Sequence, residues 1–150
     1  MDFLSYLRRT GAVAWVRGGE NNVQGTVLLY ETPKGVLVRA EIDGLPSPNG
    51  IYAFHIHEGV DCATPGGHLN PGNQKHPYHA GDLPPLFSAN GRALSVFLTA
   101  RFALRQVIGK TVILHTGPDD FTTQPSGNPG KILACGKIQP YNKRKNQSRE

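Results

Sequence analysis

Apolar and polar residues alternate along many short stretches of the chain. In residues 36–42 the apolar Val36, Val38, Ala40 and Ile42 occupy every second position. Because successive side chains of a strand point to opposite faces, this spacing predicts a β-strand with one buried face. Comparable stretches, bounded by turn residues, predict strands at residues 12–17, 23–31, 51–57, 80–83, 92–99, 111–115 and 132–138. Eight short strands favour an all-β fold, a Greek-key β-sandwich or flattened barrel.

Two segments lack this alternation and are long for loops. Residues 59–78 and 117–130 are rich in glycine, proline and polar residues. A loop of this length inside a compact domain usually has a function. At the start of the chain, Phe3, Leu4 and Leu7 have helical spacing, which fits either a short helical turn or a loose lead-in.

Composition narrows the class of protein. A chain of 150 residues with 18 glycines and 12 prolines indicates one turn-rich β domain. We place this domain at residues 11–139, between an N-terminal lead-in (1–10) and a basic flexible tail (140–150). Much of the formal charge of +5 lies at the chain ends. The basic tail is interpreted as a solvated segment, so we expect no nucleic-acid partner, and no stretch approaches the roughly 18 apolar residues of a membrane span.

Histidines gather in one part of the chain. Residues 54–82 hold five of the six histidines, and the sixth, His115, follows an apolar run. Histidine is the commonest metal ligand, so this cluster predicts a metal site rather than a run of surface histidines. In the predicted strand 51–57, His55 and His57 share the face opposite the apolar residues. Their separation along the strand, about 6–7 Å, suits two ligands of one metal.

The candidate ligands divide into two sets. These are His76, His79 and Asp82 in a short segment, and His55, His57 and His115 on outward strand faces. Zinc takes four ligands in a tetrahedron and Cu(II) suits a tetragonal set of imidazoles, so each set is one ligand short. An imidazolate can bind a cation through each ring nitrogen, and a shared His68 would complete both sets. A single zinc site with several bystander histidines fits the composition nearly as well.

Five ordered segments closely resemble the copper,zinc superoxide dismutase family. They are His55-Ile-His57-Glu58, Gly67-His68-Leu69-Asn70-Pro71, His79-Ala80-Gly81-Asp82, residues 109–115 (GKTVILH) and Leu133-Ala134-Cys135-Gly136. The resemblance covers roughly residues 11–138. It implies an eight-stranded, immunoglobulin-like Greek-key barrel in which two long loops carry the metal site.

The resemblance also implies which residues hold which metal. Copper would bind His55, His57, His68 and His115, and zinc would bind His68, His76, His79 and Asp82, with one ion of each per chain. Asp119 would be the carboxylate that orients one ligand of each metal. Cys62 and Cys135 would form a disulfide. The implied reaction is the disproportionation of superoxide to dioxygen and hydrogen peroxide, with His68 delivering a proton to the product.

The sequence departs from the family pattern near both predicted metals. The family usually has an arginine three residues before the second cysteine, where this chain has Ile132. Lys131 is the nearest cation in sequence and is our candidate anion guide, so we expect reduced but measurable activity. His76 and His79 are closer in sequence than is usual, which makes the zinc assignment the weaker half of the site. The second long loop is also shorter than usual.

Several properties stay open at the level of sequence. A non-catalytic or weakly active metal-binding relative is the alternative function, supported mainly by the missing arginine. A homodimer is compatible with the sequence. The compartment is not determined: no secretory signal pattern is visible, which favours the cytoplasm by default, whereas a disulfide fits an oxidising compartment.

Overall fold

The computed structural model describes residues 11–19 and 22–141, and nearly all of its regular structure is β-strand. The strands are β1 (Gly11–Arg17), β2 (Gln24–Thr32), β3 (Gly35–Asp43), β4 (Ile51–Tyr52), β5 (Phe54–His57), β6 (Leu86–Phe87), β7 (Ala93–Thr99), β8 (Thr111–His115) and β9 (Ile132–Tyr141). A single turn of helix, α2 (Leu104–Val107), connects β7 to β8. The all-β prediction is confirmed.

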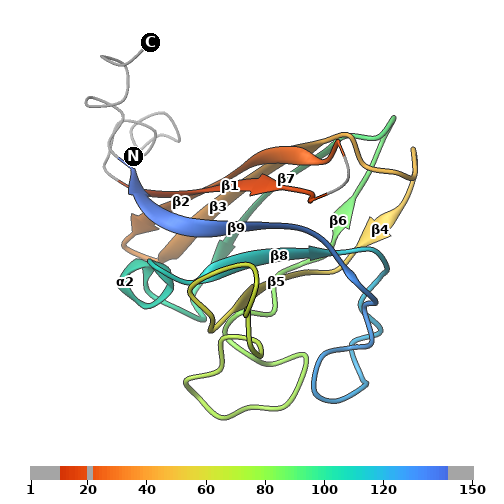
Figure 1. Cartoon of the computed structure of the whole chain (residues 1–150). Coiled ribbons are helices and arrows are strands. Elements are labelled where there is room, and N and C mark those ends of the chain that lie inside the picture. The colour runs from red at the N-terminus through yellow and green to blue at the C-terminus, as the bar shows by residue number, and fades with distance from the viewer. Residues whose placement is uncertain (1–10, 20–21, 142–150) are drawn as a thin grey trace.

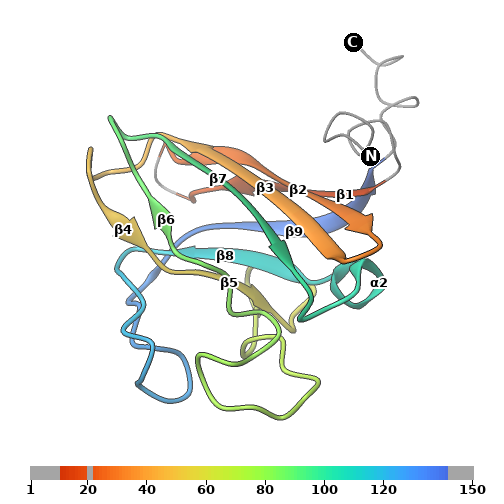
Figure 2. The same ribbon diagram turned by 180° about the vertical axis from the view of Figure 1, so that it is seen from behind.

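The strands form one curled antiparallel sheet closed by a small second sheet. Seven strands pair in the order β5-β8-β9-β1-β2-β3-β7, and β4 pairs with β6. Figures 1 and 2 show the sheet curling, so that β7 at one end lies beside β6 and the chain from β4 continues directly into β5 at the other end. The result is a Greek-key barrel in which β4 and β5 together supply one side.

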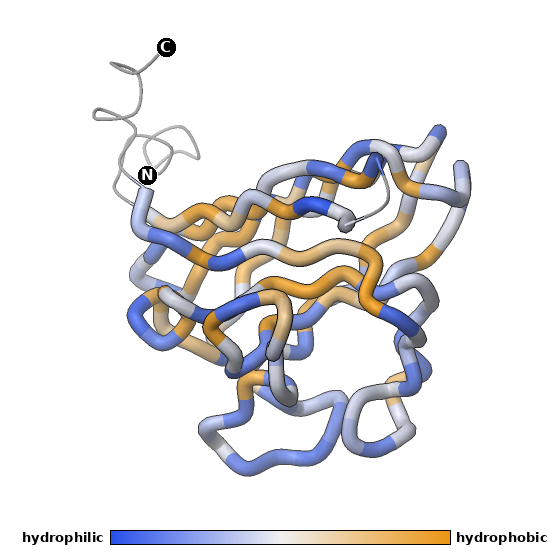
Figure 3. The backbone as a smooth tube through the Cα atoms, in the orientation of Figure 1, coloured by the Kyte–Doolittle hydropathy of each residue, from blue (hydrophilic) through white to orange (hydrophobic). Residues whose placement is uncertain are grey.

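The core lies inside this barrel, on the apolar face of each strand. In β3 the buried positions alternate strictly with half-buried ones, as residues 36–42 predict. Phe54 and Ile56 of β5 are fully buried and belong to the same apolar cluster as Val112 and Leu114 of β8. Burial of each such side chain contributes about 1.5–3 kcal/mol. Figure 3 shows the apolar residues along the strands, whereas the two long loops, which lie on one side of the barrel below β5 and β8, are mostly hydrophilic.

The prediction of a strand at residues 80–83 is wrong, because no strand of the structure spans these residues. The backbone of Gly81 instead links the loop to β5, because its carbonyl accepts from Ile56 N (2.8 Å) and its N–H donates to Leu69 O (2.9 Å). The strand of this region is β6, which starts after two consecutive prolines that cannot donate to a sheet ladder. The predicted strand 51–57 is also divided, at Ala53, whose N–H turns to Gly117 O.

The described residues begin after the predicted N-terminal lead-in and include only the start of the predicted tail. Strand β9 continues to Tyr141, two residues beyond the domain end predicted at 139. Residues 1–10, for which the sequence fits either a short helical turn or a loose lead-in, and the remainder of the basic tail lie outside the described residues. No helix in the described ranges is long and apolar enough to cross a membrane.

Candidate metal centre

Two strands and two loops bring the candidate ligands together on one side of the barrel (Figure 1). His55 and His57 come from β5 and His115 from the end of the neighbouring β8, whose Ile113 pairs with His55. These strands hold their apolar residues in the core, so their alternate side chains point to the face that the two long loops cover (Figure 1). The first loop supplies His68, His76, His79 and Asp82, and the second supplies Asp119. All six histidines are buried.

One cluster gathers around the strand histidines. The ring centroids of His55 and His57 lie 6.2 Å apart, which agrees with the spacing expected along a strand. The ring of His68 lies 4.0 Å from that of His55 and 4.8 Å from that of His57. His115 completes the group, with its centroid 5.4 Å from His55 and 5.9 Å from His57. The structure thus brings together the four residues expected to hold copper.

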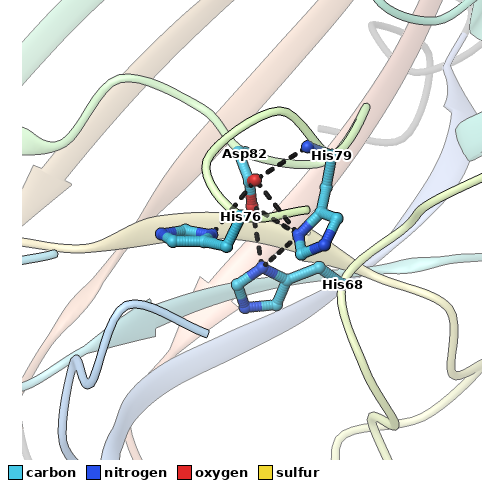
Figure 4. A group of neighbouring side chains, drawn as sticks. All are labelled: His68, His76, His79 and Asp82. Atoms are coloured by element: carbon cyan, nitrogen blue, oxygen red, sulfur yellow. Dashed lines mark hydrogen bonds and ion pairs between the residues drawn. The ribbon is translucent and has the colours of Figure 1, made fainter. Parts of the chain in front are cut away.

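A second cluster shares His68 with the first. Ligand atoms of His68, His76, His79 and Asp82 all lie within 4.8 Å of one another. Figure 4 shows the three rings converging on the Asp82 carboxylate, which lies 2.7 Å from His68 Nδ1 and 3.1 Å from the Nδ1 atoms of His76 and His79. His79 Nδ1 is also 3.3 Å from His68 Nδ1. Three nitrogens and a carboxylate in one small space are the donor set that zinc prefers.

Buried ring nitrogens without a hydrogen bond mark where the metals fit. These atoms are His55 Nδ1, His57 Nε2, His68 Nε2, His115 Nε2 and His76 Nδ1. The first four belong to the strand cluster. A buried polar atom without a partner costs free energy, so these four indicate an absent partner and would suit a tetragonal copper. His76 Nδ1 belongs to the second cluster, where it lies 3.1 Å from Asp82 Oδ2 without forming a hydrogen bond, and a cation bound there would be balanced by Asp82.

The opposite ring nitrogens are held by the protein. Asp119 lies between the clusters, with one carboxylate oxygen 2.8 Å from His55 Nε2 and the other 2.7 Å from His76 Nε2. Backbone carbonyls hold two more rings: Gly66 O lies 2.8 Å from His57 Nδ1, and Gly130 O lies 3.2 Å from His115 Nδ1. Such contacts fix the orientation of a ligand ring and select which nitrogen faces the metal.

Shifted pKa values favour the metal-binding protonation state in His55, His57, His115, Asp82 and Asp119. Burial, together with the neighbouring His68, lowers the pKa of His55 to about 3. Burial also lowers the pKa of His57 to about 4 and lowers that of His115. For Asp82 and Asp119, burial alone would raise the pKa, but hydrogen bonds with histidines outweigh it and both pKa values are lowered. At neutral pH these histidines are neutral and these carboxylates charged.

Comparison with known proteins decides the family. Residues 23–138 match the family model described as copper/zinc superoxide dismutase.

This chain belongs to the copper/zinc superoxide dismutase family.

Named relatives agree with this assignment. The copper–zinc superoxide dismutase 2 of Aquifex aeolicus is 36% identical over 140 residues, which cover 80% of this chain and 81% of that protein. The copper–zinc superoxide dismutase of Caulobacter vibrioides is 34% identical over 154 residues and 85% of each chain. The human copper chaperone for superoxide dismutase is 34% identical over 150 residues, covering 88% of this chain and 54% of the chaperone. The crystal structure titled clock protein EA4 superposes with a TM-score of 0.78 at 29% identity, covering 88% of this chain and 95% of that chain.

Family membership and the two clusters together identify the cofactors and the class of enzyme. The metals of the copper/zinc superoxide dismutase family are copper and zinc, and the histidine and aspartate clusters of this member can hold metal ions. The relatives named superoxide dismutase support an oxidoreductase activity.

The disulfide expected from the family is present. Cys62 and Cys135 are bonded, with their Cα atoms 5.9 Å apart. The bond attaches the first long loop to β9. It closes a segment of 73 residues, which in the chain-entropy picture is worth on the order of 4 kcal/mol.

At the position of the family arginine the side chain is apolar and open to solvent. Ile132 pairs with His115 across a β-bulge and is 45% exposed. Lys131 is exposed and follows Gly130, whose carbonyl contacts His115. The neighbouring backbone is fixed, because Lys131 O accepts from Thr116 N (2.9 Å).

Sequence reasoning missed the residues that support the ligands through the backbone. Gly66 and Gly130 act through their carbonyl groups, which every residue has, so no side-chain pattern points to them. Gly127 was also missed. It has a φ of +78°, and a Cβ atom there would overlap the Asp119 carboxylate and His76 Nε2. Glycine in a polar loop is too common for its position alone to give a signal.

Proposed function

We propose that this chain is a superoxide dismutase with copper held by one cluster and zinc by the other. The copper ligands are His55, His57, His68 and His115, and the zinc ligands are His68, His76, His79 and Asp82. The observation that carries the proposal is the pair of clusters joined by His68. Four buried ring nitrogens of the strand cluster make no hydrogen bond, and the ligand atoms of His68, His76, His79 and Asp82 lie within 4.8 Å of one another. This chemistry suits two metals that share one imidazole.

The reaction consumes two superoxide ions and two protons and yields one dioxygen and one hydrogen peroxide. Copper, when bound, supplies the one-electron redox chemistry for both halves. His68 can hold a proton at Nε2, an atom buried without another partner, and give it to the reduced product. The second proton comes from solvent. On the other side of the His68 ring, Asp82 Oδ1 lies 2.7 Å from Nδ1. His76, His79 and Asp82 would hold zinc there, and zinc would take no part in redox.

Anion guidance is the weaker part of the catalytic apparatus. Lys131 is the proposed guide, since it is exposed and lies next to the backbone that contacts His115. Ile132, which stands where the family usually has arginine, offers no donor for a bound anion. We therefore propose a turnover limited by superoxide docking rather than by metal redox.

The proposal is tested on the full chain loaded with copper and zinc. We expect one copper and one zinc per chain, and superoxide removal well above that of an equal amount of copper in buffer. In His115→Ala, we expect copper and activity to be lost while zinc is retained, because His115 belongs only to the strand cluster. Pulse radiolysis and metal analysis measure the two quantities. Turnover of the loaded parent no faster than free copper would refute the enzymatic function.

A second candidate is a weakly active or non-catalytic metal-binding relative. Two observations favour it: the apolar Ile132 beside His115, and the similarity to the human copper chaperone for superoxide dismutase. In that case the parent would bind both metals with the expected stoichiometry but remove superoxide no faster than the copper control. The same experiment therefore separates the two candidates.

A further inference from the structure

The short turn between His76 and His79 is held by a side chain from the other long loop. Gln124 Oε1 accepts from His76 N at 2.9 Å, and Gln124 Nε2 donates to His76 O at 2.8 Å. One amide thus pairs with both polar backbone atoms of one residue, as a neighbouring strand would. Gln124 Nε2 also contacts Thr122 O (3.1 Å), which ties the amide to its own loop. The pairing fixes both the position and the rotation of the His76 backbone.

The same loop also holds the His76 ring. Asp119 Oδ1 lies 2.7 Å from His76 Nε2, on the side of the ring opposite to Nδ1, which makes no hydrogen bond. The loop passes so close that only glycine fits at residue 127. His76 is therefore gripped at its backbone by Gln124 and at its ring by Asp119. With both contacts in place, His76 Nδ1 faces Asp82 Oδ2 at 3.1 Å.

A second long side chain supports the turn from the barrel. Arg101, which follows β7, donates from Nη1 to Pro77 O (2.9 Å) and His79 O (3.3 Å). An open pocket of about 370 Å³ lies beside these contacts, lined among others by Pro77, Arg101, Asp119 and Phe121. The turn is therefore not backed by a continuous layer of packed side chains, and hydrogen bonds hold it instead.

These contacts bear on how a turn of this length can bind a metal. Ligands on an unsupported loop must be ordered at the moment of binding, and the lost conformational entropy lowers affinity. Gln124 and Arg101 order the turn beforehand. Neither is a ligand, and neither is part of the family motifs in this sequence.

We propose that Gln124 is a positioning residue for the zinc cluster, with Arg101 as a second support of the same turn. The Gln124 amide holds His76 so that Nδ1 faces zinc, and it couples zinc binding to the order of residues 117–130. Among the described residues, Arg101 forms hydrogen bonds to the turn and none to that loop. The inference depends on the proposed zinc site.

The test measures zinc release from the zinc-loaded full chain into a chromophoric chelator. Gln124→Met keeps the length of the side chain but loses both hydrogen bonds, and we expect about ten-fold faster release. Gln139→Ala is the matched control, because Gln139 is an exposed glutamine of β9 away from the turn. It should release zinc at the parent rate. The visible spectrum of Co²⁺ bound in place of zinc should change in Gln124→Met and not in the control, because ligand geometry changes only there.

Arg101→Met tests whether zinc binding is coupled to the order of residues 117–130 through Gln124, or whether any loosening of the turn has the same effect. We expect it to release zinc faster while residues 117–130 stay as resistant to limited proteolysis as in the zinc-loaded parent. Gln124→Met should both release zinc faster and make residues 117–130 more susceptible to limited proteolysis. Parental zinc release and Co²⁺ spectrum in Gln124→Met would overturn the inference and leave the proposed function intact. A parent chain that binds no zinc at all would instead refute the zinc half of the proposed function.

Discussion

At the scale of single residues, one carboxylate and two backbone carbonyls hold the orientation of the histidine rings. Asp119 contacts one ring of each cluster, and backbone carbonyls of Gly66 and Gly130 hold two other rings. The types of the ligands were predictable from sequence, because few other residues can bind metals of this kind. Their supports were not predictable in the same way, because a carbonyl or a glycine carries no distinctive pattern.

Substitution of Gly127 tests whether the second loop must lie as close to Asp119 and His76 as it does. Gly127→Ala combines a left-handed backbone with an overlap on Asp119 and His76, so we expect lower affinity for both metals in equilibrium competition. Gly109→Ala is the control, because Gly109 has a φ of +87° but open space where its Cβ would lie. Both variants should lose about 1–2 kcal/mol of stability from the backbone. Equal metal affinities in the two variants would contradict the role given to the overlap.

The lowered histidine pKa values predict that the metal-free protein loses stability in acid. His55 and His57 titrate at about 3 and about 4 in the folded chain and near 6.5 when unfolded. Between those values the unfolded chain binds more protons, so stability falls as pH drops below about 6.5 and stops falling from this source near pH 3. His57 alone accounts for on the order of 3 kcal/mol. Urea unfolding of the metal-free chain across this range measures the loss, and a flat profile from pH 6.5 to 4 would contradict it.

At the scale of elements, strand periodicity predicted well where one face of a strand carries the core residues. Strand β3 alternates buried with half-buried positions. Strands β5 and β8 are buried throughout, but their core residues alternate with residues of the other face, and this alternation alone placed His55 and His57 side by side. Strand β6 escaped prediction because two residues cannot show a period. The segment at 80–83 looked like a strand, but its backbone bonds to β5 and to the loop instead of a ladder.

The disulfide joins two of these elements and should matter to copper more than to zinc. It anchors the first loop near Gly66, whose carbonyl holds His57. Reduction should lower the free energy of unfolding by up to about 4 kcal/mol and speed copper release. Guanidinium unfolding and copper transfer to a chelator, with and without reductant, measure both effects. Cys62→Ser/Cys135→Ser is the control, since it should behave like the reduced parent and not respond to reductant.

At the scale of the whole molecule, the distribution of charge around the copper cluster governs how fast an anion arrives. The described residues place Lys131 beside this region and an apolar Ile132 at its edge. A positive field in a cleft raises the association rate of an anion, and salt screens it. The family resemblance, not the residue pattern, was needed to recognise that a cation is expected at residue 132.

Restoring a guanidinium at the site should therefore raise activity. Ile132→Arg is expected to increase superoxide removal several-fold and to steepen its dependence on ionic strength, whereas Lys131→Ala should lower both. Ile108→Arg adds the same charge at another partly exposed position, before β8, and controls for net charge. A rate for Ile108→Arg equal to that of Ile132→Arg would show that overall charge, and not local docking, sets the rate.

The single carboxylate of Asp119 has a consequence for how the holoprotein is assembled. Each of its oxygens contacts a different ring, so a cation that shifts the His55 ring would also shift the carboxylate that holds the His76 ring, and the reverse. Binding of the first metal would therefore change the geometry of the second site. A protein that holds only copper would differ in structure from one that holds only zinc. The history of metal delivery, and not only the final supply, would decide how quickly a complete molecule is formed.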